Sequence, residues 1–172
     1  MLTQNLNIDS LLDDLETAIR QQITGRKLRN PLLIGIHSGG AWVAKHIHQR
    51  LGMVEPLGLL DITFYRDDFS QIGMHPKIKP SQLPPNLEGR DIILIDDVFY
   101  TGRTIRAALN EIFDYGRPNQ VLLAVLIERD GRQIPIQPDC AGTRLNLPPG
   151  QRIKITGPEP MGVHIQTIAH AA

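Results

Sequence analysis

The sequence has little cysteine and no excess of charge of either sign. Cys140 is the single cysteine among 172 residues, so the chain cannot form an internal disulfide or a multi-cysteine metal cluster. Eighteen lysine and arginine residues balance eighteen aspartate and glutamate residues, and this balance gives no general attraction to nucleic acid or to anionic membranes. These features predict a cytoplasmic protein in which any basic surface is local.

Long hydrophobic runs are also lacking. No apolar run approaches the roughly 18 residues that a membrane-spanning helix needs, and the first residues lack the basic and apolar regions of a signal peptide. We therefore expect no membrane partner. With 41% hydrophobic residues, a chain of this length can bury a core, and we expect one domain over residues 1–172.

Helix-like and strand-like segments alternate along the chain. Apolar residues at helical spacing predict helices over residues 8–23, 41–51 and 104–115, with Trp42 on the apolar face of the second helix and expected in the core. Alternation with short apolar runs is typical of an α/β fold, a mostly parallel twisted sheet flanked by helices. The predicted strands span residues 31–36, 54–62, 91–95, 121–127, 152–156 and 163–165.

A proline-rich segment interrupts this alternation. Four prolines fall between Phe69 and Asn86, so this segment cannot be one regular element. Loops of this length are uncommon inside a compact domain and often act as lids. We expect a mobile active-site flap at about residues 64–86, and a β-hairpin arm for packing or dimerisation is the alternative that the sequence leaves open.

Two adjacent carboxylates follow the strand predicted at residues 91–95. Asp96 and Asp97 repel each other there and need hydroxyl or metal partners to stay ionised. The small-residue turn from Tyr100 to Thr104 then leads into a helix N-terminus, where free backbone N–H groups favour a phosphate. Because ligands of parallel sheets bind beyond the carboxyl ends of the strands, this order predicts a site for a ribose 5-phosphate.

Other interpretations of the two carboxylates remain open. Asp96 and Asp97 could cap the turn, or bind Mg²⁺ directly as a carboxylate pair. The common nucleotide motifs are not alternatives, because the sequence contains neither G-x-x-x-x-G-K-[ST] nor G-x-G-x-x-G after a strand.

Residues 93–104 resemble the phosphoribosyl pyrophosphate (PRPP) signature of type I phosphoribosyltransferases. The stretch from Asp96 to Leu109 is similar to the PyrR type, a family of pyrimidine operon regulators and uracil phosphoribosyltransferases. The likeness extends through residues 61–68, 116–118 and 123–127 and covers roughly residues 6–145. It implies the type I phosphoribosyltransferase fold, with a mobile flap and a small hood at about residues 128–172, and at least a homodimer.

The resemblance also implies roles for individual residues. Asp96 and Asp97 hold the ribose hydroxyls of PRPP and interact with Mg²⁺ indirectly or through PRPP, and Arg66 on the flap neutralises the departing pyrophosphate. The other expected PRPP contacts are His37, Ser38, Gly39, Gly40, Tyr100, Thr101, Gly102, Arg103 and Thr104. The residues expected to frame the base are Val98, Glu128, Arg129, Arg132, Asp139 and Cys140.

Two positions depart from the family pattern. His37 stands where the regulators often carry a cationic residue, which leaves more charge neutralisation to Mg²⁺ and Arg66. An ordinary turn histidine is the alternative at this position. Cys140 stands where the family usually has an aromatic residue that stacks on the base, and a thiol stacks less well.

The main functional prediction is Mg²⁺-dependent transfer of a phosphoribosyl group from PRPP to uracil, which gives UMP and contributes to regulating pyrimidine synthesis. The alternative is an RNA-binding regulator that senses the nucleotide with little or no catalysis. RNA binding needs a basic face, but from residue 100 onward eight basic residues face six acidic ones, a net of +2. An mRNA leader is therefore the second expected partner. Transfer to a purine ranks lower, because purine enzymes commonly carry Asp where Tyr100 stands.

Overall fold

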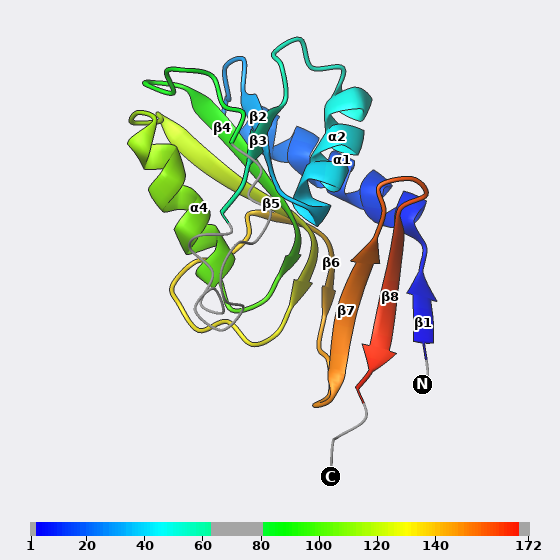
Figure 1. The fold of residues 1–172 in the computed structure, drawn as a ribbon. Helices are drawn as coiled ribbons and strands as arrows, with labels where there is room; N and C mark the ends of the chain where they lie inside the picture. Colours follow the sequence, from blue (N-terminus) through cyan, green and yellow to red (C-terminus); the bar gives the residue numbers. More distant parts are fainter. Residues whose placement is uncertain (1–2, 63–80, 169–172) are drawn as a thin grey trace.

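A computed structural model describes residues 3–62 and 81–168 of the chain. Its centre is a five-stranded parallel sheet with the strand order β3-β2-β4-β5-β6 (Figure 1). The strands are β2 (Leu32–Ile36), β3 (Gly58–Leu60), β4 (Asp91–Phe99), β5 (Gln120–Arg129) and β6 (Cys140–Leu145). The predicted α/β class with a mostly parallel sheet is thus confirmed.

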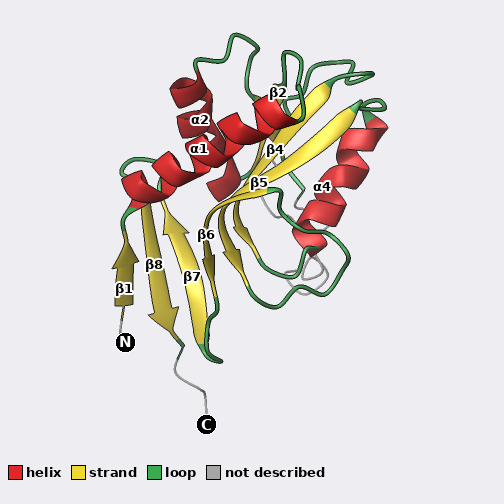
Figure 2. Ribbon diagram, turned by 180° about the vertical axis from the view of Figure 1, so that it is seen from behind, coloured by secondary structure: helices red, strands yellow, loops and turns green. Residues whose placement is uncertain are grey.

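Helices cover both faces of this sheet. Helices α1 (Ile8–Gly25) and α2 (Gly39–Leu51) lie on one face, and α4 (Arg103–Asp114) lies on the other (Figure 2). Alternate side chains of β4 pack on opposite faces of the sheet. Ile93 belongs to the hydrophobic cluster that contains residues of α1 and α2, and Ile92 belongs to the cluster that contains residues of α4. Burial on both faces explains why the strands are continuous apolar runs.

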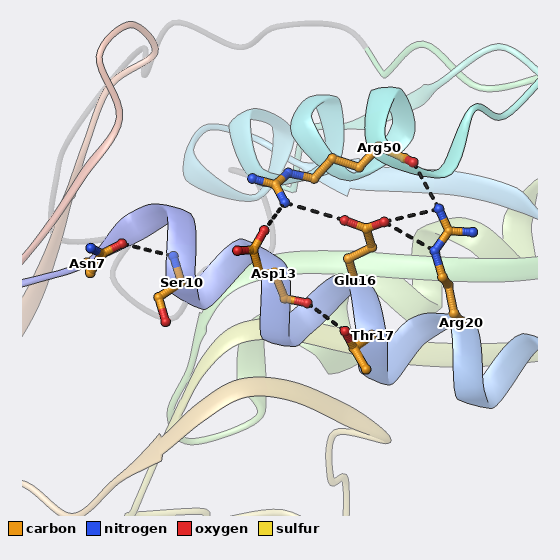
Figure 3. A network of polar contacts seen from close by, with 7 residues as sticks. All are labelled: Asn7, Ser10, Asp13, Glu16, Thr17, Arg20 and Arg50. Atoms are coloured by element: carbon orange, nitrogen blue, oxygen red, sulfur yellow. Dashed lines mark hydrogen bonds and ion pairs between the residues drawn. The ribbon is translucent and has the colours of Figure 1, made fainter.

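Polar contacts fix α1 at its start and along its outer side (Figure 3). The side chain of Asn7 accepts a hydrogen bond from the backbone N–H of Ser10 at 2.9 Å and so caps the helix. Farther along, Arg50 of α2 pairs with both Asp13 and Glu16 of α1. The hydrogen bond to Asp13 is the main reason that the pKa of Arg50 is raised. These pairs join the two helices on one face of the sheet.

A second, antiparallel sheet stands beside the first. Its order is β1-β8-β7, formed by β1 (Thr3–Leu6), β7 (Gln151–Thr156) and β8 (Gly162–Thr167). The start of β1 and the end of β8 lie at the same end of this small sheet (Figure 1). We call it the hood. It differs from the expected hood at residues 128–172, because residues 140–145 join the parallel sheet and the third hood strand comes from the N-terminus.

The boundaries of several elements also differ from those predicted. Strand β4 was expected to end at residue 95 but continues to Phe99, because most of the added residues pair with β5. Helix α2 begins at Gly39 and not at Ala41. In the described part of the chain, no helix has the length and apolar character needed to cross a membrane.

Candidate functional site

The sheet topology places a crevice between β2 and β4. These two strands are neighbours, but the chain continues from β2 to β3 on one side and from β4 to β5 on the other. At such a switch point the connections diverge from the carboxyl ends of the strands and leave room for a ligand. The glycine turn, residues 37–40, follows β2, and the carboxylates of Asp96 and Asp97 stand near the end of β4, so both lie at this point.

Glycines let the two sides of the crevice approach closely. A Cβ atom at Gly39 would lie 2.0 Å from Oδ2 of Asp97, and one at Gly40 would lie 2.9 Å from Oδ1 of Asp96. Both values are shorter than any stable non-bonded contact, so only glycine fits at these two positions. The sequence therefore puts the backbone of the turn directly against the two carboxylates.

Backbone amides partly satisfy both carboxylates. The N–H of Asp97 donates to Oδ1 of Asp96 at 2.9 Å, and the N–H of Val98 donates to Oδ1 of Asp97 at 2.7 Å. Asp96 is 5% exposed, whereas Asp97 is half-buried and faces the crevice. The pair thus offers carboxylate oxygens to a ligand from a fixed backbone, without the flexibility of a loop.

A cavity of about 330 Å³ occupies the crevice. Seven predicted site residues line it: His37, Ser38, Gly39, Asp96, Asp97, Val98 and Thr104. Two further lining residues were not predicted for the site, Trp42 of α2 and Ile155 of β7. The presence of Ile155 shows that the hood borders one side of the cavity.

Trp42 both packs against the core and lines the cavity, and its helical spacing predicted only the core position. It packs against the core beneath α1 and α2, which confirms in part the core position expected from the sequence. The same half-buried side chain lines the cavity, and a Cβ at Gly157 would lie 2.7 Å from its Cε3 atom. Its place one helical turn after the glycine turn was the available signal. Ile155 had none, because it lies far along the chain.

The turn from Tyr100 to Thr104 leads from β4 into α4. Gly102 has a φ of 94°, which is accessible to glycine at little cost, and it directly precedes the helix. The hydroxyl of Thr101 accepts a hydrogen bond from the N–H of Arg103 at 3.2 Å. Thr104, in the first turn of α4, reaches the cavity. The N-terminus of α4 and its dipole thus lie beside the carboxylates, as the sequence predicts.

The residues predicted to frame the base lie in several places. Val98 lines the cavity. Glu128 pairs with Arg144 at 2.7 Å, and the exposed Arg132 donates to Gln137 at 3.3 Å. Arg129 stacks on Tyr100 at the edge of the signature turn.

Asp139 and Cys140 are not brought to the cavity. They lie at the amino end of β6, whereas the cavity lies at the carboxyl ends of the strands. Asp139 pairs with Arg26 of the α1 terminus and accepts a hydrogen bond from the N–H of Leu123 at 2.8 Å. Cys140 is 3% exposed in the core, and this burial raises the pKa of its thiol to about 11. Both residues therefore serve the packing of α1 on the sheet.

Residues 64–80 of the predicted flap, including Arg66, lie outside the described residues. The flap's far end is described and is fixed to the domain. Ser81 accepts a hydrogen bond from the N–H of Asp61 at 3.1 Å and donates to Glu111 of α4 at 2.7 Å. Gln82 forms a β-bridge with Leu59. Ser81 and Gln82 thus lie next to β3.

The donor set fits Mg²⁺ only together with a phosphate-bearing ligand. Among residues 3–62 and 81–168, no group of three or more His, Cys, Asp and Glu side chains could hold a metal ion. Mg²⁺ commonly uses one or two carboxylates and takes its other ligands from water and substrate phosphates. Asp96 and Asp97 match that arrangement.

Comparison with known sequences identifies close relatives. Residues 2–147 match the family described as "Phosphoribosyl transferase domain". The chain is 53% identical over 166 residues to a bifunctional protein PyrR of Nitrosococcus oceani, covering 95% of this chain and 94% of that protein. It is 47% identical to a bifunctional protein PyrR of Pseudomonas putida, covering 96% of each.

Comparison with solved structures shows the same fold at low identity. A hypoxanthine phosphoribosyl transferase of Trypanosoma cruzi matches with a TM-score of 0.65 and 17% identity, covering 84% of this chain and 78% of that one. A purine phosphoribosyltransferase of Pyrococcus horikoshii matches with a TM-score of 0.60 and 22% identity, covering 78% and 84% respectively. These neighbours confirm the predicted phosphoribosyltransferase fold.

Proposed function

The chain belongs to the phosphoribosyl transferase family, in its PyrR-type branch, and from this premise we propose that it transfers the phosphoribosyl group of PRPP to uracil. The products are UMP and pyrophosphate. The observation that carries the proposal is the cavity in which Asp96 and Asp97 face the glycine turn beside the N-terminus of α4. Carboxylates, backbone amides and a helix N-terminus are the groups that a ribose carrying a phosphate and a pyrophosphate requires.

Each part of the cavity matches one part of PRPP. The oxygens of Asp96 and Asp97 accept hydrogen bonds from the ribose hydroxyls, and the turn from Tyr100 to Thr104 binds the 5-phosphate through its backbone N–H groups. The turn from His37 to Gly40 faces the anomeric side and receives the pyrophosphate. Since the imidazole of His37 is a weaker cation than lysine or arginine, we assign much of the neutralisation to Arg66.

The reaction is a displacement at the anomeric carbon of the ribose. The bond to the pyrophosphate oxygen breaks, a bond to a uracil ring nitrogen forms, and the proton of that nitrogen leaves to solvent. Positive charge develops on the sugar ring, and the carboxylates of Asp96 and Asp97 stabilise it. Mg²⁺, when bound with PRPP, supplies charge neutralisation for the departing pyrophosphate.

The variant Asp97→Asn tests this assignment. The amide keeps the size of the side chain but removes its negative charge, and we expect kcat to fall at least about 100-fold, in the range seen when one electrostatic contact is removed. The control is Asp114→Asn at the exposed end of α4, which removes the same charge away from the cavity. Unchanged turnover by Asp97→Asn would contradict the assignment.

A second activity, regulation through RNA, accompanies this proposal. The relatives named "Bifunctional protein PyrR" are the observation that favours it. The test is binding to a pyrimidine-operon leader transcript at several salt concentrations, with and without UMP. Affinity that falls with salt and changes with UMP supports the regulator, and equal binding to an unrelated transcript contradicts it. We also propose that the protein forms a homodimer, as the family resemblance implies. We propose a cytoplasmic location as well, because a single buried thiol, Cys140, fits a reducing compartment.

A further inference from the structure

The last residue of β5 and the segment after it lie against the turn that joins β4 to α4. We call residues 129–134 the brace and residues 100–104 the phosphate turn. At the start of the brace, the guanidinium carbon of Arg129 lies 4.0 Å from the ring centroid of Tyr100. Nη1 of the same side chain donates to the carbonyl oxygen of Gln151 in hood strand β7 at 3.4 Å. Arg129 therefore links three parts of the molecule, namely β5, the phosphate turn and the hood.

The rest of the brace also fits closely against the phosphate turn. Gly131 has a φ of 117°, and a Cβ there would lie 2.4 Å from Cε2 of Tyr100. The N–H of Gln133 donates to the carbonyl oxygen of Thr101 at 3.0 Å, and its side chain accepts from Nε of Arg103 at 3.2 Å. The ring of Tyr100 is thus held by Arg129 and Gly131 together.

The ring contact is the main described restraint on the guanidinium of Arg129. Its Nε atom is buried and has no hydrogen-bond partner among the described residues. Its hydrogen bond to Gln151 is long at 3.4 Å, and such bonds are weak. A planar guanidinium stacks on an aromatic face in a way that an ammonium group cannot. The arrangement therefore depends on arginine and not on positive charge alone.

We infer that Arg129 is a positioning residue that holds Tyr100 and the phosphate turn in the shape that binds the 5-phosphate of PRPP. This inference rests on the proposed function and replaces the base contact expected for Arg129 from the sequence. Its consequence is specific. Loss of the stack weakens binding of the phosphoribosyl part of the substrate and leaves binding of the base little changed.

Two ligands separate these outcomes in the intact protein. Ribose 5-phosphate probes the phosphate turn without any transfer step, and its binding can be followed by the fluorescence of Trp42, the single tryptophan, which lines the cavity. For Arg129→Met we expect the Kd for ribose 5-phosphate and the KM for PRPP to rise about five- to twentyfold, the range of a lost partly buried cation–π contact. We expect the KM for uracil and kcat to stay within about twofold, since uniform binding is what is lost.

Further variants test the stack itself. Arg129→Lys keeps the charge but not the planar group, so we expect it to resemble Arg129→Met. Tyr100→Leu should weaken ribose 5-phosphate binding similarly. The double variant, with both Arg129→Met and Tyr100→Leu, should bind ribose 5-phosphate no more weakly than the weaker of the two single variants, because each substitution removes the same contact. Arg152→Met, on the exposed side of β7, controls for loss of an arginine near the hood, and thermal unfolding checks that each variant is folded.

Contrary results are distinct from a failure of the proposed function. Full rescue by Arg129→Lys, additive effects in the double variant, or a raised KM for uracil with unchanged ribose 5-phosphate binding would each overturn the positioning role. The proposed function fails separately, if the unaltered protein releases no pyrophosphate from PRPP and uracil. Ribose 5-phosphate binding can be measured in that case as well, so the role of Arg129 in shaping the turn is tested either way.

Discussion

Gly39 lies where the turn after β2 meets the carboxylates of Asp96 and Asp97 near the end of β4. A side chain at this position would have to displace Asp97, since a Cβ would lie 2.0 Å from its Oδ2 atom. The carboxylate belongs to the strand that forms the centre of the sheet and cannot move without cost. The chemistry of the site therefore depends on a residue that contributes no functional group.

We predict that Gly39→Ala lowers kcat/KM for PRPP at least about 100-fold, because a shift of about 1 Å in a catalytic group has effects of this size. The measurement is a steady-state assay of pyrophosphate release, together with circular dichroism to confirm the fold. Gly25→Ala is the matched control, because a Cβ at Gly25 meets no atom within 4 Å. Activity of Gly39→Ala close to that of the control would show that the turn does not press on Asp97.

Asp91 shows how a single carboxylate holds elements together at the other end of β4. It is 5% exposed and accepts hydrogen bonds from the N–H of Arg29 at 2.8 Å and from Nδ2 of Asn119 at 2.7 Å. Burial alone would raise the pKa of Asp91, but these hydrogen bonds outweigh it and the pKa is lowered. Strand β4 is thereby tied to the segments before β2 and β5.

We predict that Asp91→Asn costs about 1–3 kcal/mol of unfolding free energy at pH 7, the usual cost of breaking buried hydrogen bonds to a charged group. Because the folded pKa is lowered, the stabilisation is present above the unfolded pKa of about 4 and is lost as the pH falls through the lower folded value. The free energy of unfolding of the unaltered protein and of Asp91→Asn is measured with urea at pH 7 and at pH 3. The difference between the two proteins should be smaller at pH 3, and a constant or larger difference would contradict this account.

The elements that could be predicted are those whose pattern is local. Helix α1 follows from its apolar stripe and the cap at Asn7, and β4 follows from its continuous apolar run. Strand β6 was missed because the residues before its final Leu145 are small or polar, and the strand is held by pairing with β5 and packing under α1. Strand β1 is likewise short and polar, and only its pairing with β8 makes it a strand.

The same distinction applies to the site. The residues of the glycine turn and of the signature turn could be predicted, because each set is contiguous and ends a strand. Ile155 could not, since it reaches the cavity only when the hood packs beside the parallel sheet. Cys140 was misplaced for a related reason. Its position in a family pattern says nothing about which end of a strand it occupies, and β6 presents it at the end away from the cavity.

At the scale of the whole molecule, the two sheets contribute different parts of the cavity. The parallel sheet fixes the phosphate turn, the glycine turn and the carboxylates at one edge, and the hood adds Ile155 and covers Trp42 with Gly157. The two purine phosphoribosyltransferase structures compared share this fold at 22% identity or below.

The most direct test of the account is a steady-state assay of the purified protein with Mg²⁺ and PRPP against uracil, hypoxanthine, guanine and orotate, each supplied separately. Pyrophosphate release is followed for each base. We predict turnover with uracil, and little or none with the two purines and with orotate. Turnover with a purine and not with uracil, or tight PRPP binding without turnover on any base, would contradict the proposed uracil phosphoribosyltransferase.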